Sequence, residues 1–311
     1  MSAAAAAAAA AALPPPRIAT SDWQPLFVPQ QLFTDRQGEV NAFLETNPAA
    51  FIDDDGRMTV LVRLVNYRKF HTRAFKMGGA FSESRYVVWR GSLQGHRFVP
   101  DGDAEAVAWD SADAPRAFSV WRGIEDARFL GAADRIMATA PELNVAGGGA
   151  PRLITATLVG STARLETLLE PSVVEKNWLP FFVEGRAYGV YSVEPFVVKR
   201  LADATMATLG RCAALRDYHG SSNGVPWEGG HLFLIHRSFK EHRWLYFGPS
   251  YYAYSEPFVF LPHSYIEFPC SLSLLPSGGL LVGLGVNDAA AFLVVVNSPA
   301  LPTMTSVAFT V

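Results

Sequence analysis

A strand–turn–strand unit recurs five times along this chain and limits the folds open to it. In each unit, two apolar stretches with a period of two, the spacing of a β-strand, flank a turn that is rich in Gly and Asp. The turns fall at Asp53–Gly56, Gly131–Asp134, Glu184–Gly185, Glu228–Gly230 and Ser277–Gly279. They lie about 45 to 80 residues apart, which is too far for a simple sandwich and suits blades of about four strands. The pattern predicts an all-β fold, a five-bladed β-propeller.

A two-sheet sandwich or an irregular barrel is the alternative to this fold. An α/β fold is disfavoured because no long amphipathic helix is evident in the sequence. The one helix-like stretch, Lys199–Arg216, contains several Ala and Leu residues and is interpreted as a surface connector between blades.

The chain has 311 residues, of which 50% are hydrophobic and 18% charged, enough for a substantial core. It begins with an alanine run closed by Leu13 and three prolines, which predicts a low-complexity tail over residues 1–20. Residues 21–311 are expected to form one propeller domain. The alanine run is not expected to be a signal peptide, because no Lys or Arg precedes it and no small-residue cleavage site follows.

The net charge and the cysteines exclude several classes of function. A net charge of −3 gives no global field to attract nucleic acid or an anionic membrane, so an anion needs a local site. The two cysteines, Cys212 and Cys270, lack the spacing of a disulfide framework or a zinc site. We therefore expect no metal or cofactor, no nucleic-acid or membrane partner, and a cytoplasmic location.

Two charged segments stand where apolar strands begin. They are Trp121–Phe129 and Glu175–Phe181, and in each a carboxylate lies beside a cation. A partly solvated charge is costly unless it is paired or binds something. The alternative is that Glu125 with Arg128, and Glu175 with Lys176, are ion pairs that fasten strand ends. Together the two segments favour a sugar-phosphate site.

These segments belong to a series of motifs that carries a family resemblance. In order, the chain contains Asn47-Pro48, Gly123–Arg128, Lys176–Trp178, Leu232–His236 and Phe268–Asp288, across about 260 residues. The series resembles that of the inverting β-mannoside phosphorylases of glycoside hydrolase family 130. Within that relationship, the compact length and the alanine tail are most similar to the β-1,2-mannosyltransferase/phosphorylases of trypanosomatid mannogen metabolism.

The resemblance implies a fold, a substrate and a reaction. It implies a five-bladed propeller that acts reversibly on β-1,2-linked mannooligosaccharide with inorganic phosphate and yields mannose 1-phosphate. Transfer of mannose from GDP-mannose at the same site is a further activity that it admits, and a GDP-mannose-dependent transferase without phosphorolysis is the main alternative.

By resemblance, Asp126 is the general acid, and its proton reaches the glycosidic oxygen through a hydroxyl of the mannose ring. Glu125 and Arg128 are expected to shift its pKa in opposite directions. Ala127 departs from the proline usual in the family, which affects the geometry of the acid's loop. Substrate binding is assigned to Asn47, Arg63, Glu125, Arg128 and Asp288, although a turn residue is the alternative for Asp288.

Phosphate is already an anionic nucleophile, so a phosphorylase needs cations where an inverting hydrolase needs a second carboxylate as base. The sequence supplies Arg152, Arg164, Lys176 and His236 as cations, with Asn177 as a neutral donor. These match the family's phosphate-binding positions. A surface charge is the alternative for Arg164, and a satisfied core histidine is the alternative for His236.

Two further clusters have functional and structural interpretations. The basic, aromatic run Tyr67–Arg73 with Lys76 fits a site for a nucleotide diphosphate or an anionic acceptor, or else a solvated loop. Aromatic residues between Trp227 and Tyr265 fit stacking on sugar rings, or else packing between blades. A hydrolase on the same fold and a non-catalytic binding platform complete the alternatives for function.

Overall fold

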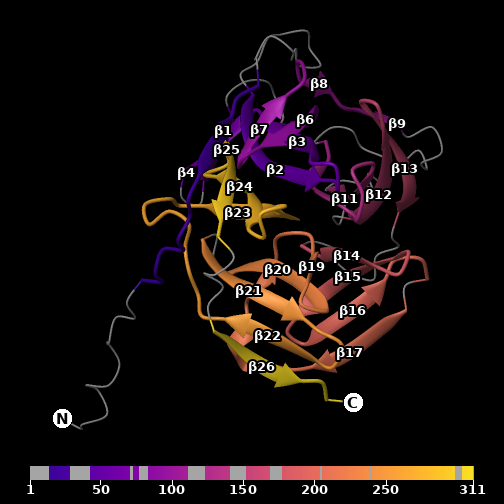
Figure 1. Cartoon of the computed structure of the whole chain (residues 1–311), viewed down its shortest axis with the longest axis vertical. Coiled ribbons are helices and arrows are strands. Elements are labelled where there is room, and N and C mark those ends of the chain that lie inside the picture. Colours follow the sequence, from indigo (N-terminus) through magenta and orange to yellow (C-terminus); the bar gives the residue numbers. More distant parts are fainter. Residues whose placement is uncertain are drawn as a thin grey trace.

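The computed structural model describes residues 14–28, 43–70, 73–76, 83–110, 123–140, 152–168, 177–203, 205–237, 240–297 and 303–310, and their side chains except at 68–70, 73–76, 152 and 167–168. Five sheets, antiparallel apart from one parallel strand pair, are arranged around a central axis, which confirms the predicted five-bladed propeller (Figure 1). We number the blades I to V in the order in which their innermost strands occur in the chain.

Blades I and II come from the first half of the chain. From the axis outward, blade I consists of β2 (Leu44–Ile52), β3 (Arg57–Val65), β6 (Ser84–Gln94) and β7 (Arg97–Pro100), with β8 (Glu105–Ala106) also on β6. Blade II consists of β10 (Glu125–Phe129), β11 (Arg135–Ala140), β12 (Arg152–Val159), β13 (Thr162–Leu168) and β9 (Ala108–Asp110). A separate hairpin pairs β4 (Tyr67–Phe70) with β5 (Arg73–Lys76).

The second half of the chain supplies the other three blades. Blade III consists of β14 (Leu179–Val183), β15 (Arg186–Val193), β16 (Phe196–Arg200) and β17 (Met206–Gly210). Blade IV consists of β18 (His219–Gly220) and β19 (Val225–Trp227), both on β20 (Gly230–Arg237), then β21 (Glu241–Phe247), β22 (Tyr251–Ser255) and β26 (Met304–Ala308). Blade V consists of β23 (Glu267–Leu274), β24 (Leu280–Val286), β25 (Ala290–Val296) and β1 (Trp23–Leu26).

The five predicted turns join the innermost strand of each blade to the second strand. Each turn contains a glycine with a positive φ of 73° to 86°, which a residue with a Cβ rarely adopts. These glycines are Gly56, Gly131, Gly185, Gly229 and Gly278. The repeated turn is therefore one structural device, used once in each blade.

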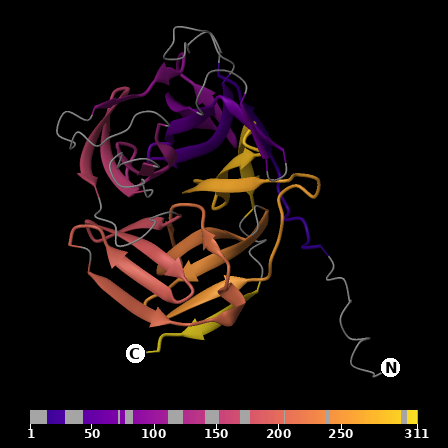
Figure 2. The ribbon, with the colours of Figure 1, turned by 180° about the vertical axis from the view of Figure 1, so that it is seen from behind.

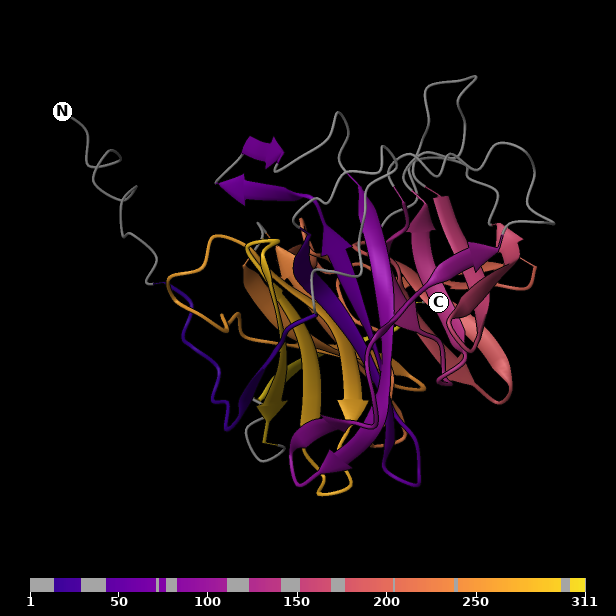
Figure 3. The same ribbon diagram turned by 90° about the horizontal axis from the view of Figure 1, so that it is seen from above.

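The two ends of the described chain lie on neighbouring blades. β1 is the outer strand of blade V beside β25, and β26 is the outer strand of blade IV beside β22 (Figures 1 and 2). Blade V thus joins the start of the chain to its later part. Figure 3 shows the strands of blade V beside those of blade I where the ring closes, and β2 contacts both β23 and β24.

Apolar side chains fill each of the five boundaries between blades. On β3, Val60 and Val62 point to blade V while Leu61 points to blade II, which is the alternation that a strand buried on both faces requires. Blades IV and V share a second cluster around Trp244, blades III and IV share one around Phe181, and blades II and III share a small one around Trp178. The ring is closed by packing on all sides.

Two expectations are corrected by the structure. The described residues of Lys199–Arg216 are not helical apart from a 3₁₀ turn at Ala213–Leu215, because Met206–Gly210 pairs with β16 and completes blade III. The alanine content favours a helix only weakly, and sheet pairing overrides it. The tail ends earlier than residue 20, since Ile18 donates a backbone hydrogen bond to Val259 at 2.9 Å. Residues 1–13 lie outside the described part of the chain.

No helix among the described residues has the length and apolar character needed to cross a membrane.

Candidate active site

Five of the predicted site residues lie at, or beside, the N-terminal ends of the innermost strands. Asn47 lies in β2, Asp126 in β10, and Asn177 two residues before β14. His236 lies opposite His219, where β18 begins. Asp288 follows β24, whose last residue is paired with Glu267 at the start of β23. All five blades therefore present a predicted residue, or a neighbour of one, at the same end of the channel.

Four of these residues have left-handed backbone although they carry side chains: Asp288 in the turn between β24 and β25, and three others at, or beside, the starts of innermost strands. The φ angles are 40° at Asn47, 50° at Asp126 and 60° at Asn177. At the first two the strand also bulges, because the register shifts between Thr46 and Ala49 and between Glu125 and Arg128. Such conformations cost energy and cluster at functional sites. Here Asn47, Asp126 and Asn177 lie at equivalent places in blades I, II and III.

Asp126 is held by two donors from blade I. Its Oδ1 accepts hydrogen bonds from Asn47 Nδ2 at 2.9 Å and from Arg63 Nη1 at 3.2 Å. Only 12% of the Asp126 side chain is exposed. Both donors stabilise negative charge on that oxygen, and the structure brings Asn47, Arg63 and Asp126 together as predicted.

Arg63 binds both carboxylates of the motif in blade II. Its Nη2 lies 2.8 Å from Glu125 Oε1, and its Nε donates to Ser84 Oγ at 2.6 Å. Burial opposes the charge on Arg63, but Glu125, Tyr67 and Asp126 raise its pKa well above the usual value. Arg63 is therefore a permanent cation that positions Glu125 and Asp126.

Arg128 is completely buried at the centre of the ring. Its Nε donates to the carbonyl oxygen of Ser221, and its Nη1 donates to that of Trp178 at 3.2 Å. Its Cζ lies 5.6 Å from the centroid of the Phe268 ring, and its Nη2 has no hydrogen-bond partner among the described residues. Arg128 thus joins blades II, III, IV and V beneath the site.

His236 is neutral at ordinary pH, which corrects the expectation that it supplies a cation. Burial lowers its pKa to about 3, and His242, His219 and Arg128 act in the same direction. Its Nδ1 lies 2.7 Å from Ser221 Oγ. His236 can therefore offer an anion a hydrogen bond but not a positive charge.

Asp288 is buried in the turn between β24 and β25, with a φ of 50°. The preceding Asn287 accepts backbone hydrogen bonds from Tyr265 at 2.9 Å and Ile266 at 3.1 Å, which holds the turn against the start of β23. Asp288 thus fits both interpretations offered by the sequence, as a turn residue and as a residue at the mouth.

The remaining predicted cations are distributed unequally. Arg152 begins β12 opposite Ala140, at the same end of blade II as Glu125, although its side chain is not described. Lys176 lies outside the described residues. Arg164 is exposed on β13, beside Asp110 of β9 at the outer edge of blade II. The structure does not bring Arg164 to the channel, because two strands separate it from β10, and its assignment to phosphate is not supported.

The two further clusters also differ in outcome. Tyr67 places its hydroxyl 3.5 Å from Arg63 Nη2, so the β4–β5 hairpin starts beside the site, but its basic side chains are not described. Trp244 and Tyr252 are fully buried, and Tyr252 stacks on Phe196 at 4.5 Å. These two aromatic residues therefore pack in and between blades.

Sequence reasoning missed residues that contact the backbone next to Asp126. Tyr86 Oη accepts a hydrogen bond from the Ala127 amide at 3.0 Å, and Cys270 Sγ lies 3.5 Å from the Ala127 carbonyl oxygen. Burial raises the pKa of Cys270 to about 12, so the thiol stays protonated. Tyr86 pairs directly with Arg63 across β3 and β6. The only signal for Tyr86 was its position opposite Arg63. That position becomes known only when the pairing of β3 with β6 is known.

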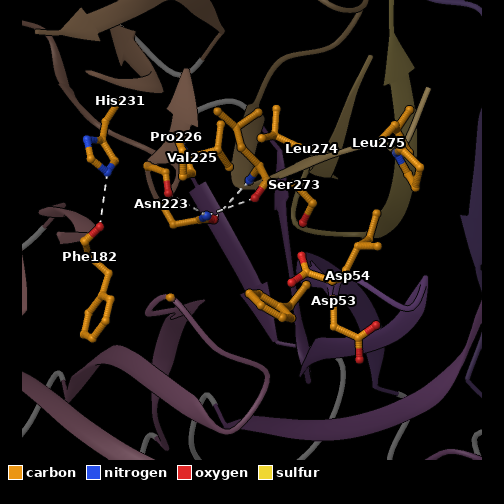
Figure 4. A pocket seen from close by; sticks show the side chains of 16 residues that line it. Asp53, Asp54, Phe182, Asn223, Val225, Pro226, His231, Ser273, Leu274 and Leu275 are labelled. Atoms are coloured by element: carbon orange, nitrogen blue, oxygen red, sulfur yellow. Dashed lines mark hydrogen bonds between the residues drawn. The ribbon is translucent and has the colours of Figure 1, made fainter. Parts of the chain in front are cut away.

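A cavity of about 500 Å³ occupies the opposite end of the channel, where the innermost strands finish (Figure 4). Its polar residues are largely engaged with the backbone. His231 Nε2 lies 3.2 Å from the Phe182 carbonyl oxygen, and Asn223 exchanges hydrogen bonds of 2.9 and 3.0 Å with the backbone of Leu272. Burial lowers the pKa of His231. This end of the channel holds none of the predicted site residues.

No protein-family model and no curated protein matches the chain. Among solved structures, it is similar to a glycosyl hydrolase from Bacteroides ovatus, with a TM-score of 0.56 and 13% identity over 93% of each chain. A GH43_1 enzyme from Xanthomonas citri has a TM-score of 0.55 and 13% identity, over 86% of this chain and 92% of that one. MPT-4, a mannose phosphorylase from Leishmania mexicana, reaches 0.49 and 9% identity over 93% and 92%, too weak a similarity to bear on function. The first two similarities show that the chain has the propeller fold found in glycoside hydrolases.

Proposed function

We propose that this protein is an inverting β-mannoside phosphorylase, which converts β-1,2-linked mannooligosaccharide and phosphate to mannose 1-phosphate. The observation that carries the proposal is the set of equivalent left-handed positions, which hold Asn47, Asp126 and Asn177. An inverting hydrolase needs two carboxylates, one as acid and one as base. An amide cannot take up a proton as a base does, so these three positions offer one acid and no base. Asp288, the fourth residue with left-handed backbone at the mouth, lies in the turn between β24 and β25 and is assigned to the substrate.

The other carboxylate of the motif in blade II is engaged. Glu125 lies 2.8 Å from Arg63, whose charge is permanent, and this ion pair opposes a role for Glu125 as the base. Asp126 contacts the same arginine and also accepts a hydrogen bond from Asn47. Its side chain is less exposed than that of Glu125. These contacts favour Asp126 as the group that transfers the proton, with Glu125 as a neighbour that orients Arg63 and substrate.

In the proposed reaction, a phosphate oxygen attacks the anomeric carbon as the glycosidic bond breaks. The leaving oxygen receives the proton that Asp126 supplies through a hydroxyl of the sugar, and the electron pair of the broken bond stays on that oxygen. Phosphate brings its own negative charge, so no residue has to deprotonate the nucleophile. One acid is sufficient.

We assign phosphate to Arg152, Asn177 and His236, at the mouth ends of blades II, III and IV, and to Lys176, which precedes Asn177 in the sequence and lies outside the described residues. His236 contributes as a neutral hydrogen-bonding group, and the positive charge comes from Arg152 and Lys176. Buried Arg128 adds positive potential from below. The β-mannoside substrate contacts Asn47 and Asp288 at the rim, beside blades I and V.

The test is product analysis with Asp126→Asn, which keeps the size and removes the proton. The purified protein with β-1,2-mannooligosaccharide and phosphate should release mannose 1-phosphate, identified by mass spectrometry and NMR. Asp126→Asn should lower this rate by about 10²- to 10⁴-fold, the usual contribution of a general acid. Asp134→Asn, an exposed substitution in the turn at the opposite end of blade II, is the matched control. Release of free mannose in place of mannose 1-phosphate would overturn the proposal in favour of hydrolysis.

A GDP-mannose-dependent β-1,2-mannosyltransferase is the second candidate. The contact of Tyr67 with Arg63 supports it, because this contact places the start of the basic β4–β5 segment beside the acid. The same cations would hold a diphosphate. Elongation of mannose or mannobiose from GDP-mannose, without release of mannose 1-phosphate in the presence of phosphate, would establish the transferase.

The expected cytoplasmic location remains part of the proposal. Both Cys212 and Cys270 are unpaired, and persistent free thiols are usual in reducing compartments. Fractionation of the source cells with an antibody to the protein tests this expectation.

A further inference from the structure

Three histidines lie side by side across the mouth end of blade IV. His236 of β20 lies directly opposite His219 on β18 and His242 on β21. Leu234 and Trp244 stand two residues from His236 and His242 on the same strands, and both belong to the apolar cluster between blades IV and V. Because every second side chain of a strand points to the same face, His236 and His242 also face blade V. The row therefore runs from the exposed His219 into the buried boundary of these two blades.

Glu267 of blade V closes the buried end of the row. His242 Nε2 lies 3.0 Å from Glu267 Oε2, and neither side chain is exposed. The carboxylate also accepts the backbone amides of Phe260 at 2.9 Å and Leu261 at 2.7 Å. Burial acts to raise the pKa of Glu267, but its hydrogen bonds outweigh that effect and leave the pKa below its usual value. Glu267 is therefore ionised, so it accepts a hydrogen bond from His242 Nε2 and can balance a positive charge on that ring.

His236 has no such partner. It forms no ion pair with a described residue, and most of the charges around it act against its protonation. Burial lowers its pKa, as do His242, His219 and Arg128, while Asp126 acts in the opposite direction. The ring is therefore neutral and carries one proton, on either Nδ1 or Nε2. The nitrogen that carries the proton decides what the ring can offer a ligand.

Ser221 contacts His236 through a completely buried hydroxyl. Its Oγ lies 2.7 Å from His236 Nδ1 and makes no other hydrogen bond to a described residue. If Nδ1 carried the proton, the hydroxyl hydrogen would be buried without an acceptor, which is costly. If the hydroxyl donates to a bare Nδ1, both groups are satisfied. The carbonyl oxygen of Ser221 is held as well, because Arg128 Nε donates to it.

We propose that Ser221 is a positioning residue: its hydroxyl donates to His236 Nδ1 and so keeps the single proton of the neutral ring on Nε2. His236 Nε2 makes no hydrogen bond to a described residue, and it is the nitrogen left for a ligand. The inference goes beyond the proposed function in the state of His236 and rests on that function for the ligand, which is inorganic phosphate.

A neutral N–H suits the phosphate of the proposed reaction. An imidazolium beside phosphate can pass it a proton, which would make the attacking oxygen a weaker nucleophile. The Nε2–H of a neutral imidazole holds the anion without this transfer. A neutral hydrogen bond is also weaker than a charge-assisted one, so mannose 1-phosphate can leave. The opposite tautomer would present a lone pair to the anion and repel it, so Ser221 decides whether His236 attracts or repels the nucleophile.

The test observes the ring directly, by NMR of the ¹⁵N-labelled full chain at neutral pH. Two-bond correlation between the ring protons and nitrogens distinguishes a nitrogen that carries a proton from a bare one. The signals of His236 are identified by their loss in His236→Gln. The unmodified protein should show a proton on Nε2 and none on Nδ1. In Ser221→Ala the fixed tautomer should be lost, and the two nitrogens should share the proton.

Ser222→Ala is the matched control. Ser222 is the next residue and equally buried, but its hydroxyl donates to the Asn223 carbonyl oxygen and accepts the Leu234 amide, both at 2.8 Å. The control thus loses backbone hydrogen bonds without removing a contact of His236, and it should keep the tautomer. Calorimetry with inorganic phosphate should show affinity reduced about three- to tenfold in Ser221→Ala, the effect of one neutral hydrogen bond, and unchanged within about twofold in Ser222→Ala.

A proton on Nδ1 of the unmodified protein, or protons on both nitrogens, would overturn the inference. So would a fixed Nε2 proton that persists in Ser221→Ala, or the same loss of the tautomer in Ser222→Ala. Loss of the tautomer in Ser221→Ala alone, with no binding of phosphate to the unmodified protein, would support the role of Ser221 while removing phosphate from the site. The inference and the proposed function can therefore fail separately.

Discussion

At the scale of single residues, three blades have left-handed backbone at side-chain-bearing positions where their innermost strands begin at the mouth of the channel, and Glu184 and Glu228 have it in the turns at the opposite end. Asn47, Asp126 and Asn177 share this conformation in three blades, and a strand bulge accompanies the first two. Such strain persists only where surrounding contacts fix it. For Asp126 those contacts come from Asn47 and Arg63, two residues distant in sequence. The motif therefore singled out the residue that we propose as the acid, while the contacts that hold it depended on the fold.

Replacing Arg63 with methionine should cost about 3–5 kcal/mol of unfolding free energy, because it leaves the Glu125 and Asp126 carboxylates without their shared buried cation. Chemical denaturation measures this loss. Arg164→Met is the control, since Arg164 is exposed on an outer strand, and it should change stability by no more than about 0.5 kcal/mol. The Arg164→Met substitution should also leave the KM for phosphate unchanged. A raised KM in Arg164→Met would restore that residue to the phosphate site.

His236 leads to a prediction about pH. Its pKa is lowered to about 3 in the fold from 6.5, so between these values the unfolded chain binds more protons than the folded one. His236 therefore does not reduce the free energy of unfolding above about pH 6.5. It reduces the free energy of unfolding progressively as the pH falls toward 3. The free energy of unfolding of His236→Gln should decrease less between pH 7 and pH 5 than that of the unmodified protein. Equal decreases in the two proteins would contradict the lowered pKa and the neutral state of His236.

At the scale of elements, the inner hairpin is the unit that the sequence predicted best. Each of the five Gly-containing turns joins the first two strands of a blade, because a tight turn with positive φ leaves a local signature. Outer elements were predicted less well. Met206–Gly210 forms a strand where alanines and leucines resemble a helix, and Arg164 lies on an outer strand. Both depend on pairing with distant segments, which leaves no local pattern.

Gly185→Ala tests the hairpin signature. Its φ is 77° and no atom lies within 4 Å of the place that an alanine Cβ would occupy, so the cost is conformational and should be about 1–2 kcal/mol. Gly102→Ala is the matched control, because that site is equally open and its φ is not in the left-handed range. Thermal unfolding of both variants should show a loss only for Gly185→Ala. Equal losses would mean that the turn does not require glycine.

At the scale of the whole molecule, closure of the ring depends on five packed boundaries between blades. The boundary of blades II and III contains few buried residues, with Trp178 as the largest, and Lys199 Nζ lies 4.9 Å from its ring. The carbonyl oxygen of Trp178 accepts a hydrogen bond from Arg128. This boundary therefore connects the stability of the ring to the shape of the site.

Trp178→Ala should lower the free energy of unfolding by about 3–5 kcal/mol, as expected for a large buried aromatic residue. Because the boundary holds Arg128 in place, the same substitution should also reduce turnover. Trp89→Ala, at a half-buried tryptophan of blade I, should cost less and leave turnover unchanged. Denaturation followed by fluorescence, with activity assays on the folded fraction, compares the two variants.

The sequence by itself determined the class of fold and the number of blades, and it singled out the residue that we propose as the acid. These features rest on local signals: the period of two, the five Gly-containing turns and the Gly123–Arg128 motif. Only the tertiary structure decided that Arg63 serves Asp126, that His236 is neutral, that Arg164 stands apart and that Ser221 lies beside His236. Each of these depends on which distant strands become neighbours and on how deeply a side chain is buried, and neither is recorded in the order of residues along a single strand.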